Sequence, residues 1–132
     1  MSTNSGPGWK QYPEHRIATR PAGVRVQVRA GGDVLADTRD AIQLEEATGE
    51  GKSTVAPVVY YIPRKDVKTE RLVRTPKKTH CPFKGEATYY SIRSGGEEVV
   101  WSYEKPYDEM MAIKGRLAFY PDKVDAIEEL RD

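Results

Sequence analysis

Apolar and polar residues alternate with a period of two in several short stretches of this chain. In residues 24–29, valines at every second position alternate with arginine and glutamine, the pattern of a half-buried strand. Gly31 and Gly32 follow, and paired glycines tolerate the positive φ values of a tight hairpin. The stretch therefore predicts a hairpin with one apolar and one charged face.

Further strands are predicted along the chain. Residues 14–20 form an extended piece between two prolines, and a β-prone run ends at Pro63. Residues 86–106 predict a second hairpin with a Gly-Gly turn, and residues 116–120 a last strand. Residues 39–47 have a helical composition, but their apolar residues alternate and the piece is short, so we predict a strand.

Helical pieces are expected to be short. Residues 65–73 and 107–115 each suit a turn of helix, and residues 122–132 form a polar tail that can be helical. Together the pattern predicts a mainly β domain with about seven or eight strands. We predict a flexible N-terminal lead at residues 1–11 and one domain at residues 12–132, which is a length that one modest core can support.

Composition narrows the classes of function. The 132 residues include eight tyrosines and two tryptophans, which argues against a disordered chain. The net charge of +1 gives no strong nucleic-acid signal. No apolar run approaches the ~20 residues of a membrane helix, and the N-terminus does not resemble a secretory signal. A single cysteine excludes an internal disulfide and fits a reducing compartment. We expect a soluble cytoplasmic protein without membrane contact.

The stretch "THCPFKGEATYY" contains that cysteine, Cys81. Positive charge from His80 and Lys84 could stabilise a thiolate nucleophile. Metal binding is less suitable, because adjacent residues rarely chelate one ion, and we predict neither a metal nor a cofactor. A lone cysteine is most often a small buried side chain, which is the interpretation we favour. Lys84 could bind a carboxylate or phosphate as a point charge, or it could be an exposed lysine in a turn. Cys81 and Lys84 are thus the catalytic candidates.

Two other segments contain candidates for binding. In "IPRKDV", Arg64 could hold a planar anion with two hydrogen bonds, although an Arg64–Asp66 pair that fixes the loop explains the motif slightly better. In "WSYE", Trp101 and Tyr103 share one face of a strand, where aromatic residues are usually core and alternatively line a pocket. Two adjacent glutamates at 45 and 46 are expected to be solvated, although either could be a pocket carboxylate.

Four segments together resemble one family: "GGDVLADT", "VVYYIPRKDV", "THCPFKGEATYY" and "VVWSYEKPYDEMMAIKGRLAFY". The family is the domain of unknown function 427, also catalogued as a nucleotidyltransferase domain, and the resemblance runs from about Pro13 to Val124. It implies a β-tent (Mss4-like) fold, in which two antiparallel sheets meet at an angle over a cleft. Zinc-binding β-tent proteins use two C-x-x-C knuckles, and Cys81 stands alone here, so the resemblance implies the fold without its zinc.

The family's signature positions carried onto this chain are Arg64, Asp66, Cys81, Lys84, Gly85, Tyr89, Trp101 and Tyr103. Gly85 is explained by turn chemistry, and the resemblance implies that the polar and aromatic positions line a pocket. We hypothesise that the cleft binds an unidentified small molecule or peptide end, with ligand contacts from Arg64, Asp66, Lys84, Tyr89, Trp101 and Tyr103. An enzyme that uses Cys81 or Lys84 is one alternative. For a nucleotidyltransferase in particular, the sequence lacks the Asp-x-Asp pair expected to hold metal ions. A protein-interaction module is the other.

Overall fold

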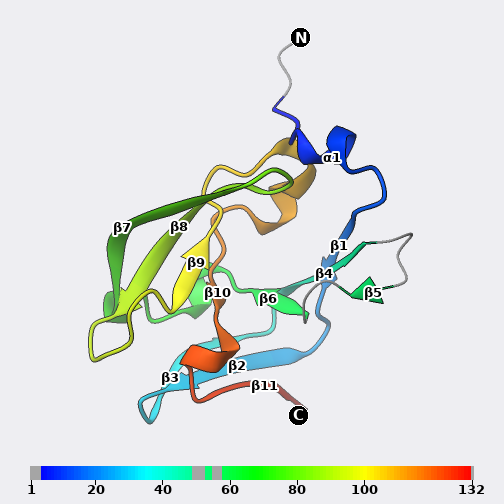
Figure 1. Cartoon of the computed structure of the whole chain (residues 1–132). Coiled ribbons are helices and arrows are strands. Elements are labelled where there is room, and N and C mark those ends of the chain that lie inside the picture. The colour runs from blue at the N-terminus through cyan, green and yellow to red at the C-terminus, as the bar shows by residue number, and fades with distance from the viewer. Residues whose placement is uncertain (1–3, 49–52, 55–57, 132) are drawn as a thin grey trace.

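The computed structural model describes residues 4–48, 53–54 and 58–131. Short strands dominate it (Figure 1). The strands are β1 (Arg16–Pro21), β2 (Arg25–Ala30), β3 (Asp33–Thr38), β4 (Ile42–Thr48), β5 (Ser53–Thr54), β6 (Val59–Tyr61), β7 (Leu72–Cys81), β8 (Gly85–Ile92), β9 (Val100–Ser102), β10 (Ala118–Phe119) and β11 (Ala126–Leu130). The helical pieces are α1 (Gly8–Gln11) and the 3-10 turns η1 (Arg64–Asp66), η2 (Thr69–Arg71), η3 (Asp108–Ile113) and η4 (Pro121–Lys123).

The described strands form three antiparallel sheets. The β4 sheet pairs β4 with β1 on one side and with β5 and β6 on the other, the β8 sheet has the order β10-β9-β8-β7, and the β2 sheet has the order β11-β2-β3. Figure 1 shows the β2 sheet at the bottom, below the other two. The predicted mainly β fold with short helical insertions is confirmed, with three sheets where two were expected.

The β2–β3 hairpin forms as its pattern predicts. Val26 and Val28 are fully buried, whereas arginines on the opposite face form ion pairs. Arg25 donates two hydrogen bonds to Asp37, at 2.7 and 2.6 Å. Gly31 and Gly32 have φ values of +60° and +83°, which side chains with a Cβ rarely adopt. The turn therefore depends on this glycine pair.

The C-terminal tail is a strand rather than a helix. Strand β11 pairs antiparallel with β2, opposing Ile127 to Val28. Arg29 of β2 donates to Glu128 of β11 at 2.6 Å. Pairing gives the outer edge of β2 a partner, and a long-range contact of this kind overrides the helical composition of the segment.

Strand β7 was not predicted. Most of its ten residues are exposed, including Arg74, Lys77 and Lys78, so no apolar alternation marks it. The strand is the outer edge of the β8 sheet and pairs with β8 alone. Lysines and Pro76 on such an edge discourage pairing with other chains. By contrast, the strand predicted at residues 39–47 is confirmed as β4.

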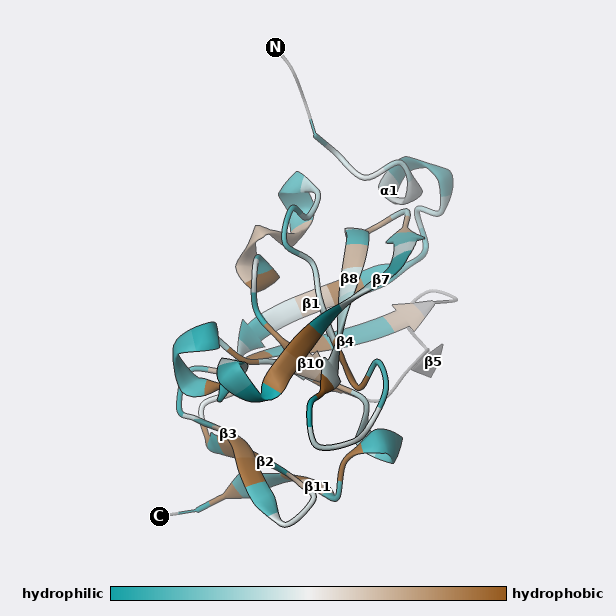
Figure 2. Ribbon diagram, turned by 90° about the vertical axis from the view of Figure 1, so that its left-hand side faces the viewer, coloured by the Kyte–Doolittle hydropathy of each residue, from teal (hydrophilic) through white to brown (hydrophobic). Residues whose placement is uncertain are grey.

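Buried side chains form two clusters where the sheets meet. One cluster joins the β2 and β8 sheets and includes Val28, Ile62 and Val100. The other joins the β4 and β8 sheets and includes Leu44 and Tyr61. Figure 2 shows hydrophobic segments on strands such as β3 and β10, with hydrophilic residues on many of the connecting turns. No helix in the described ranges is long and apolar enough to cross a membrane.

A cluster of charged residues fixes η1 to the β8 sheet. Arg64 donates to the backbone oxygen of Gly115 at 2.7 Å and to Glu104 at 3.0 Å. Arg74 and Tyr90 also donate to Glu104, at 2.9 and 2.6 Å. Burial alone would raise the pKa of Glu104, but the hydrogen bonds from Arg74 and Tyr90 and the charges of Arg74 and Arg64 outweigh it. The pKa of Glu104 therefore lies below its usual value of 4.5.

Replacing Glu104 with glutamine removes the charge that two guanidinium groups share. We expect Glu104→Gln to lower the free energy of unfolding by about 1–2 kcal/mol near neutral pH. Since the folded-state pKa is lowered, this stabilisation is fully present above the usual value of 4.5 and is lost as the pH falls through the folded value. Urea unfolding at neutral and acidic pH measures the difference.

Glu86→Gln is the matched control, because the side chain of Glu86 makes only one ion pair with the described residues, an exposed one with Lys78 at 3.8 Å. We expect it to change the free energy of unfolding by less than about 0.5 kcal/mol. A Glu104→Gln effect as small as this control, or one that persists unchanged in acid, would contradict the assignment.

Candidate functional site

The turn between β7 and β8 places Lys84 inside the molecule. Gly85 has a φ of +111°, in the region that favours glycine. A Cβ on Gly85 would come within 3.4 Å of the backbone of Lys105 and its neighbours. The backbone oxygen of Lys84 accepts a hydrogen bond from the amide of Tyr107 at 3.0 Å. Local conformation and a distant segment therefore both fix the turn.

The N-terminal segment holds the other side of this turn. The amide of Gly8 donates to the oxygen of Pro82 at 2.9 Å, and the indole of Trp9 donates to the oxygen of Phe83 at 3.0 Å. The His15 ring stacks on Phe83 with centroids 4.1 Å apart. The segment predicted as a flexible lead therefore contains helix α1, packed on the turn; its residues 1–3 lie outside the described part.

Lys84 belongs to a largely buried chain of polar groups. Its side chain is 9% exposed, and Nζ donates to Oε1 of Glu46 on β4. The other oxygen of Glu46 lies 3.0 Å from Nε2 of His15. The Glu46 and His15 side chains are 16% and 14% exposed. Both carboxylate oxygens of Glu46 thus have partners, and a buried cation and anion neutralise each other.

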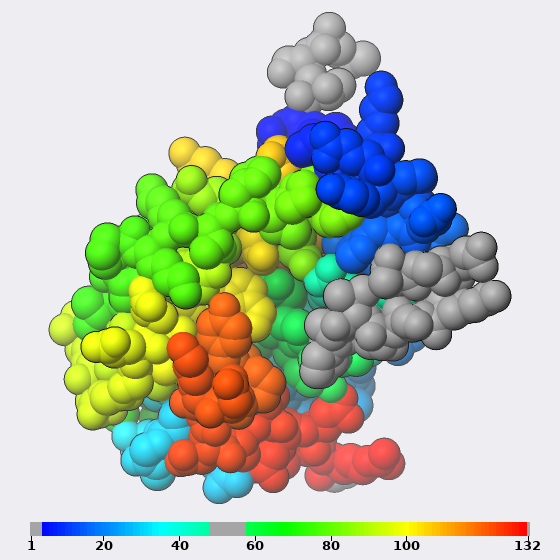
Figure 3. Space-filling model, viewed as in Figure 1, coloured from blue at the N-terminus to red at the C-terminus, as the bar shows by residue number. Residues whose placement is uncertain are grey.

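A cavity of about 610 Å³ opens beside this ion pair. Its wall comes from all three sheets, with Glu46 and Tyr61 from the β4 sheet, Tyr89 and Trp101 from the β8 sheet, and Val28 from the β2 sheet. In Figure 3 the surface is hollowed beside the projecting segment that carries η4 (orange), and β6 (green) lies recessed there. The size and the mainly apolar wall are typical of a small-molecule site.

Aromatic rings make up a large part of the cavity wall. Trp101 lies at 89° to Tyr61 with centroids 6.2 Å apart, and 4.4 Å from the ring of Tyr120. The indole N–H donates to the hydroxyl of Tyr61 at 3.2 Å. The hydroxyl of Tyr89 lies 2.7 Å from Oγ1 of Thr79. These contacts fix the rings, so the wall is largely formed before any ligand arrives.

The hydroxyls of Tyr61, Tyr103 and Tyr120 beside the cavity stay protonated at physiological pH. Burial raises the pKa of Tyr61 and of Tyr103 far above the usual value, and the Glu46 carboxylate adds to both effects. Burial, followed by a hydrogen bond with Tyr89, raises the pKa of Tyr120 to about 12. These groups can donate hydrogen bonds but do not supply negative charge.

Four of the six predicted ligand contacts line this one cavity: Lys84, Tyr89, Trp101 and Tyr103. Arg64 is absent from its wall and belongs to the Glu104 cluster. Asp66 lies elsewhere, accepting hydrogen bonds from Thr38 at 2.7 Å and from Lys65 at 2.8 Å. Arg64 and Asp66 of "IPRKDV" therefore bind different partners instead of each other, and both fix η1.

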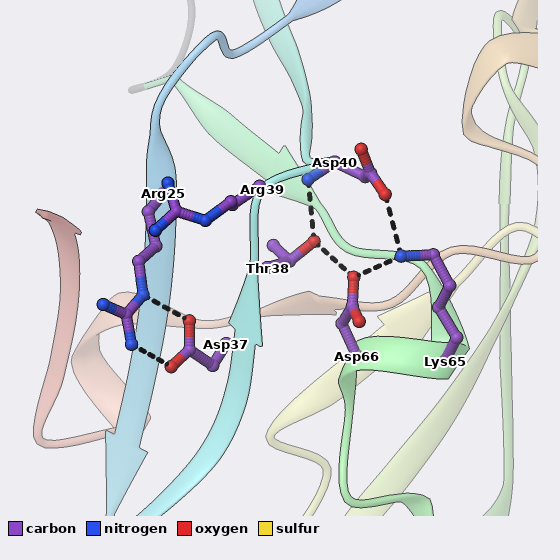
Figure 4. Close-up of a pocket in the computed structure, with 7 residues that line it drawn as sticks. All are labelled: Arg25, Asp37, Thr38, Arg39, Asp40, Lys65 and Asp66. Atoms are coloured by element: carbon purple, nitrogen blue, oxygen red, sulfur yellow. Dashed lines mark hydrogen bonds and ion pairs between the residues drawn. The ribbon is translucent and has the colours of Figure 1, made fainter. Parts of the chain in front are cut away.

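Asp66 faces a separate, charged depression (Figure 4). Its wall consists of Arg25, Asp37, Thr38, Arg39, Asp40, Lys65 and Asp66. Lys65 bridges Asp40 and Asp66 at 2.7 and 2.8 Å. The hydroxyl of Thr38 accepts from the Asp40 amide and donates to Asp66. Carboxylates and cations neutralise each other here. We therefore assign the residues of this depression a structural role, which is to hold η1 against β3.

Cys81 lies outside the cavity wall. It is half-buried, packs against the β4–β8 cluster and opposes Gly85 across the hairpin. Successive strand residues point to opposite faces, and His80 instead lies 2.7 Å from the hydroxyl of Tyr107. The pairing of His80 with Cys81 that thiolate catalysis would use is therefore not formed. Among the described residues, no group of three or more His, Cys, Asp or Glu is placed to hold a metal ion.

Sequence reasoning missed part of this site. Glu46, expected to be solvated, faces inward, as do the apolar Ile42 and Leu44 at the same alternate positions of β4. A charged residue at an inward position was the available signal, because strand residues i and i+2 share a face. Tyr61 and Tyr120 carried no comparable signal, since aromatic residues are also common in cores.

Comparison with known proteins defines the class. The profile of the domain of unknown function 427 (DUF427), labelled NTP_transf_9, matches residues 18–130, and the chain belongs to this family. No curated protein matches the sequence significantly. The family description states no function.

Removing one partner of the buried ion pair should destabilise the fold. We expect Lys84→Met to lower the free energy of unfolding by about 2–4 kcal/mol, because the buried carboxylate of Glu46 would lose its ammonium partner. The double variant Lys84→Met/Glu46→Gln should lose less than the two single variants together, by at least about 1 kcal/mol. Urea unfolding of the four proteins gives this coupling energy.

The neighbouring pair Arg20–Glu45 is the matched control. Glu45 follows Leu44 on the same strand, but its side chain is 48% exposed and that of Arg20 69% exposed. The corresponding cycle with Arg20→Met and Glu45→Gln should give a coupling energy below about 1 kcal/mol. Equal coupling in the two cycles would show that the inner pair is not energetically special.

Proposed function

We propose that this chain is a binding domain whose ligand, a small molecule or peptide end, occupies the cavity between the three sheets. The observation that carries this proposal is the cavity itself, about 610 Å³ with a wall of tyrosines and Trp101 around Lys84. Of the binding residues expected from the sequence, Lys84, Tyr89, Trp101 and Tyr103 belong to the proposal. Tyr61 and Tyr120 join them.

The alternative of a protein-interaction module has less support. Large apolar residues exposed in the described chain are Tyr12, Val58, Val73 and Met111, and they belong to different segments. A docking surface would favour a contiguous apolar patch. The cavity instead gathers its apolar surface into a concave wall, which favours a ligand of limited size.

The cost of building such a site also favours binding. A closely packed core needs no cavity, and filling it with larger side chains would bury more apolar surface. Aromatic residues around an open hollow leave part of their surface exposed to water, as Trp101 and Tyr120 are here only half-buried. A ligand with an apolar body would cover these rings and gain the free energy of that burial.

A thermal-shift screen with organic acids, nucleotides and short peptides tests the proposal. Ligands raise the melting temperature by mass action. For any hit, we expect Trp101→Ala to weaken binding at least about tenfold, because it removes the largest ring of the wall. Isothermal titration calorimetry of folded variants measures the dissociation constants.

Tyr12→Ala is the matched control, since Tyr12 is 57% exposed and lies outside the cavity wall. It should bind each hit as the parent protein does. A screen without hits, or hits that are equally insensitive to both substitutions, would refute the cavity as the binding site.

A further inference from the structure

Several hydrogen-bond donors at the cavity have no acceptor among the described residues. An ammonium group has three N–H donors, and Lys84 uses one of them, toward Glu46. The hydroxyl of Tyr61 accepts the indole N–H of Trp101, and its own proton has no acceptor among the described residues. The hydroxyl of Tyr103 makes no hydrogen bond within the described part of the chain.

Tyr103 is the most informative of these groups. The residue is only 8% exposed, and burying a hydroxyl without a partner is costly. In the described chain, every side-chain nitrogen or oxygen that is fully shielded from solvent has a hydrogen-bond partner. The Tyr103 oxygen is therefore reachable from outside, and Tyr103 belongs to the cavity wall. A hydroxyl held in this way is available to a ligand.

The charge around these donors disfavours a cationic ligand. Glu46 is the carboxylate in the described wall, and its two oxygens already face Lys84 and His15. A ligand cation among the aromatic rings would have to displace Lys84 or lie beside its charge. Two further ammonium groups lie over rings of the wall, Lys77 at 4.6 Å from Tyr89 and Lys123 at 5.2 Å from Tyr120.

A carboxylate matches this set of donors. It accepts hydrogen bonds at about four lone-pair positions and donates none. Among the described residues, the donors without an acceptor are two N–H groups of Lys84 and one O–H each from Tyr61 and Tyr103. The bond to the ammonium would be charge-assisted, and such bonds are roughly twice as strong as neutral ones. An amine head could use the Tyr103 oxygen as an acceptor, but its positive charge would lie beside that of Lys84.

We infer that the ligand of this cavity presents a carboxylate to Lys84, Tyr61 and Tyr103 and lays an apolar body against Trp101 and Tyr120. This inference rests on the proposed function and adds the chemical class of the ligand. The carboxylate belongs either to a small organic acid or to the C-terminus of a peptide, and both offer the same head group to the same donors.

A series of compounds with one body and different heads tests the inference. The probes are 3-phenylpropanoate, its amide, the corresponding alcohol and the corresponding trimethylammonium compound, and the same four heads on an indole body. Two tripeptides ending in phenylalanine, one with a free and one with an amidated C-terminus, distinguish a peptide source. Dissociation constants are measured by calorimetry on the full chain.

We expect each carboxylate to bind at least about tenfold more tightly than its amide, alcohol or ammonium analogue, as a charge-assisted interaction worth about 1.4 kcal/mol or more requires. If the analogues bind as tightly as the carboxylates, the head-group inference is wrong while the proposed binding function stands. If none of these compounds and no compound of the screen binds, both are wrong.

Tyr103→Phe sharpens this test because it removes one oxygen and keeps the ring. Since that hydroxyl has no partner among the described residues, the variant should remain as stable as the parent protein. We expect it to weaken carboxylate binding about fivefold or more and to leave trimethylammonium binding unchanged. Tyr12→Phe is the control, because Tyr12 is 57% exposed and lies outside the cavity wall, and it should bind every probe normally. Unchanged carboxylate affinity in Tyr103→Phe would overturn the inference.

Discussion

The buried ion pair between Lys84 and Glu46 is the constraint on which the site depends. Burying either charge alone would cost several kcal/mol. The two charges lie together because a turn of the β8 sheet and a strand of the β4 sheet meet at this point. The pair therefore does two things. It links two sheets across their interface, and it leaves part of an ammonium group facing a cavity with aromatic walls.

The surrounding structure holds this pair from several directions. The N-terminal segment packs on Phe83 and places His15 against Glu46, and the amide of Tyr107 binds the backbone oxygen of Lys84 itself. These contacts join residues far apart in the sequence. A turn fixed by so many distant partners loses little conformational freedom when a ligand binds, which favours affinity.

The fold was more predictable from the sequence than the site. Alternating valines and a Gly-Gly pair determine the β2–β3 hairpin locally, and period-two alternation was enough to identify β4 despite its helical composition. Strand β7 is exposed on both faces and β11 has a helical composition, so each depends on pairing with a partner strand. Local patterns contain no information about such pairing.

For the site, residue types were informative but neighbours were not. Lys84, Tyr89, Trp101 and Tyr103 were predicted to line a pocket, and the structure places all four in the wall of one cavity. Arg64 was expected among them because Arg64 and Lys84 both suit an anion. The structure satisfies the guanidinium with Glu104 and a backbone oxygen instead. The partners of each cation depend on long-range packing, which a local sequence pattern does not show. Glu46 is an example, because its partner Lys84 lies 38 residues away in the sequence.

The contrast between the two charged regions supports assigning function to only one of them. Around η1, Arg64, Asp66 and Lys65 face opposite charges or backbone oxygens at hydrogen-bond distance, so a ligand there would have to break existing interactions. In the aromatic cavity, donors on Lys84, Tyr61 and Tyr103 have no acceptor among the described residues, although the polar groups that are fully shielded from solvent are paired. An acceptor supplied from outside would satisfy all of these donors at once.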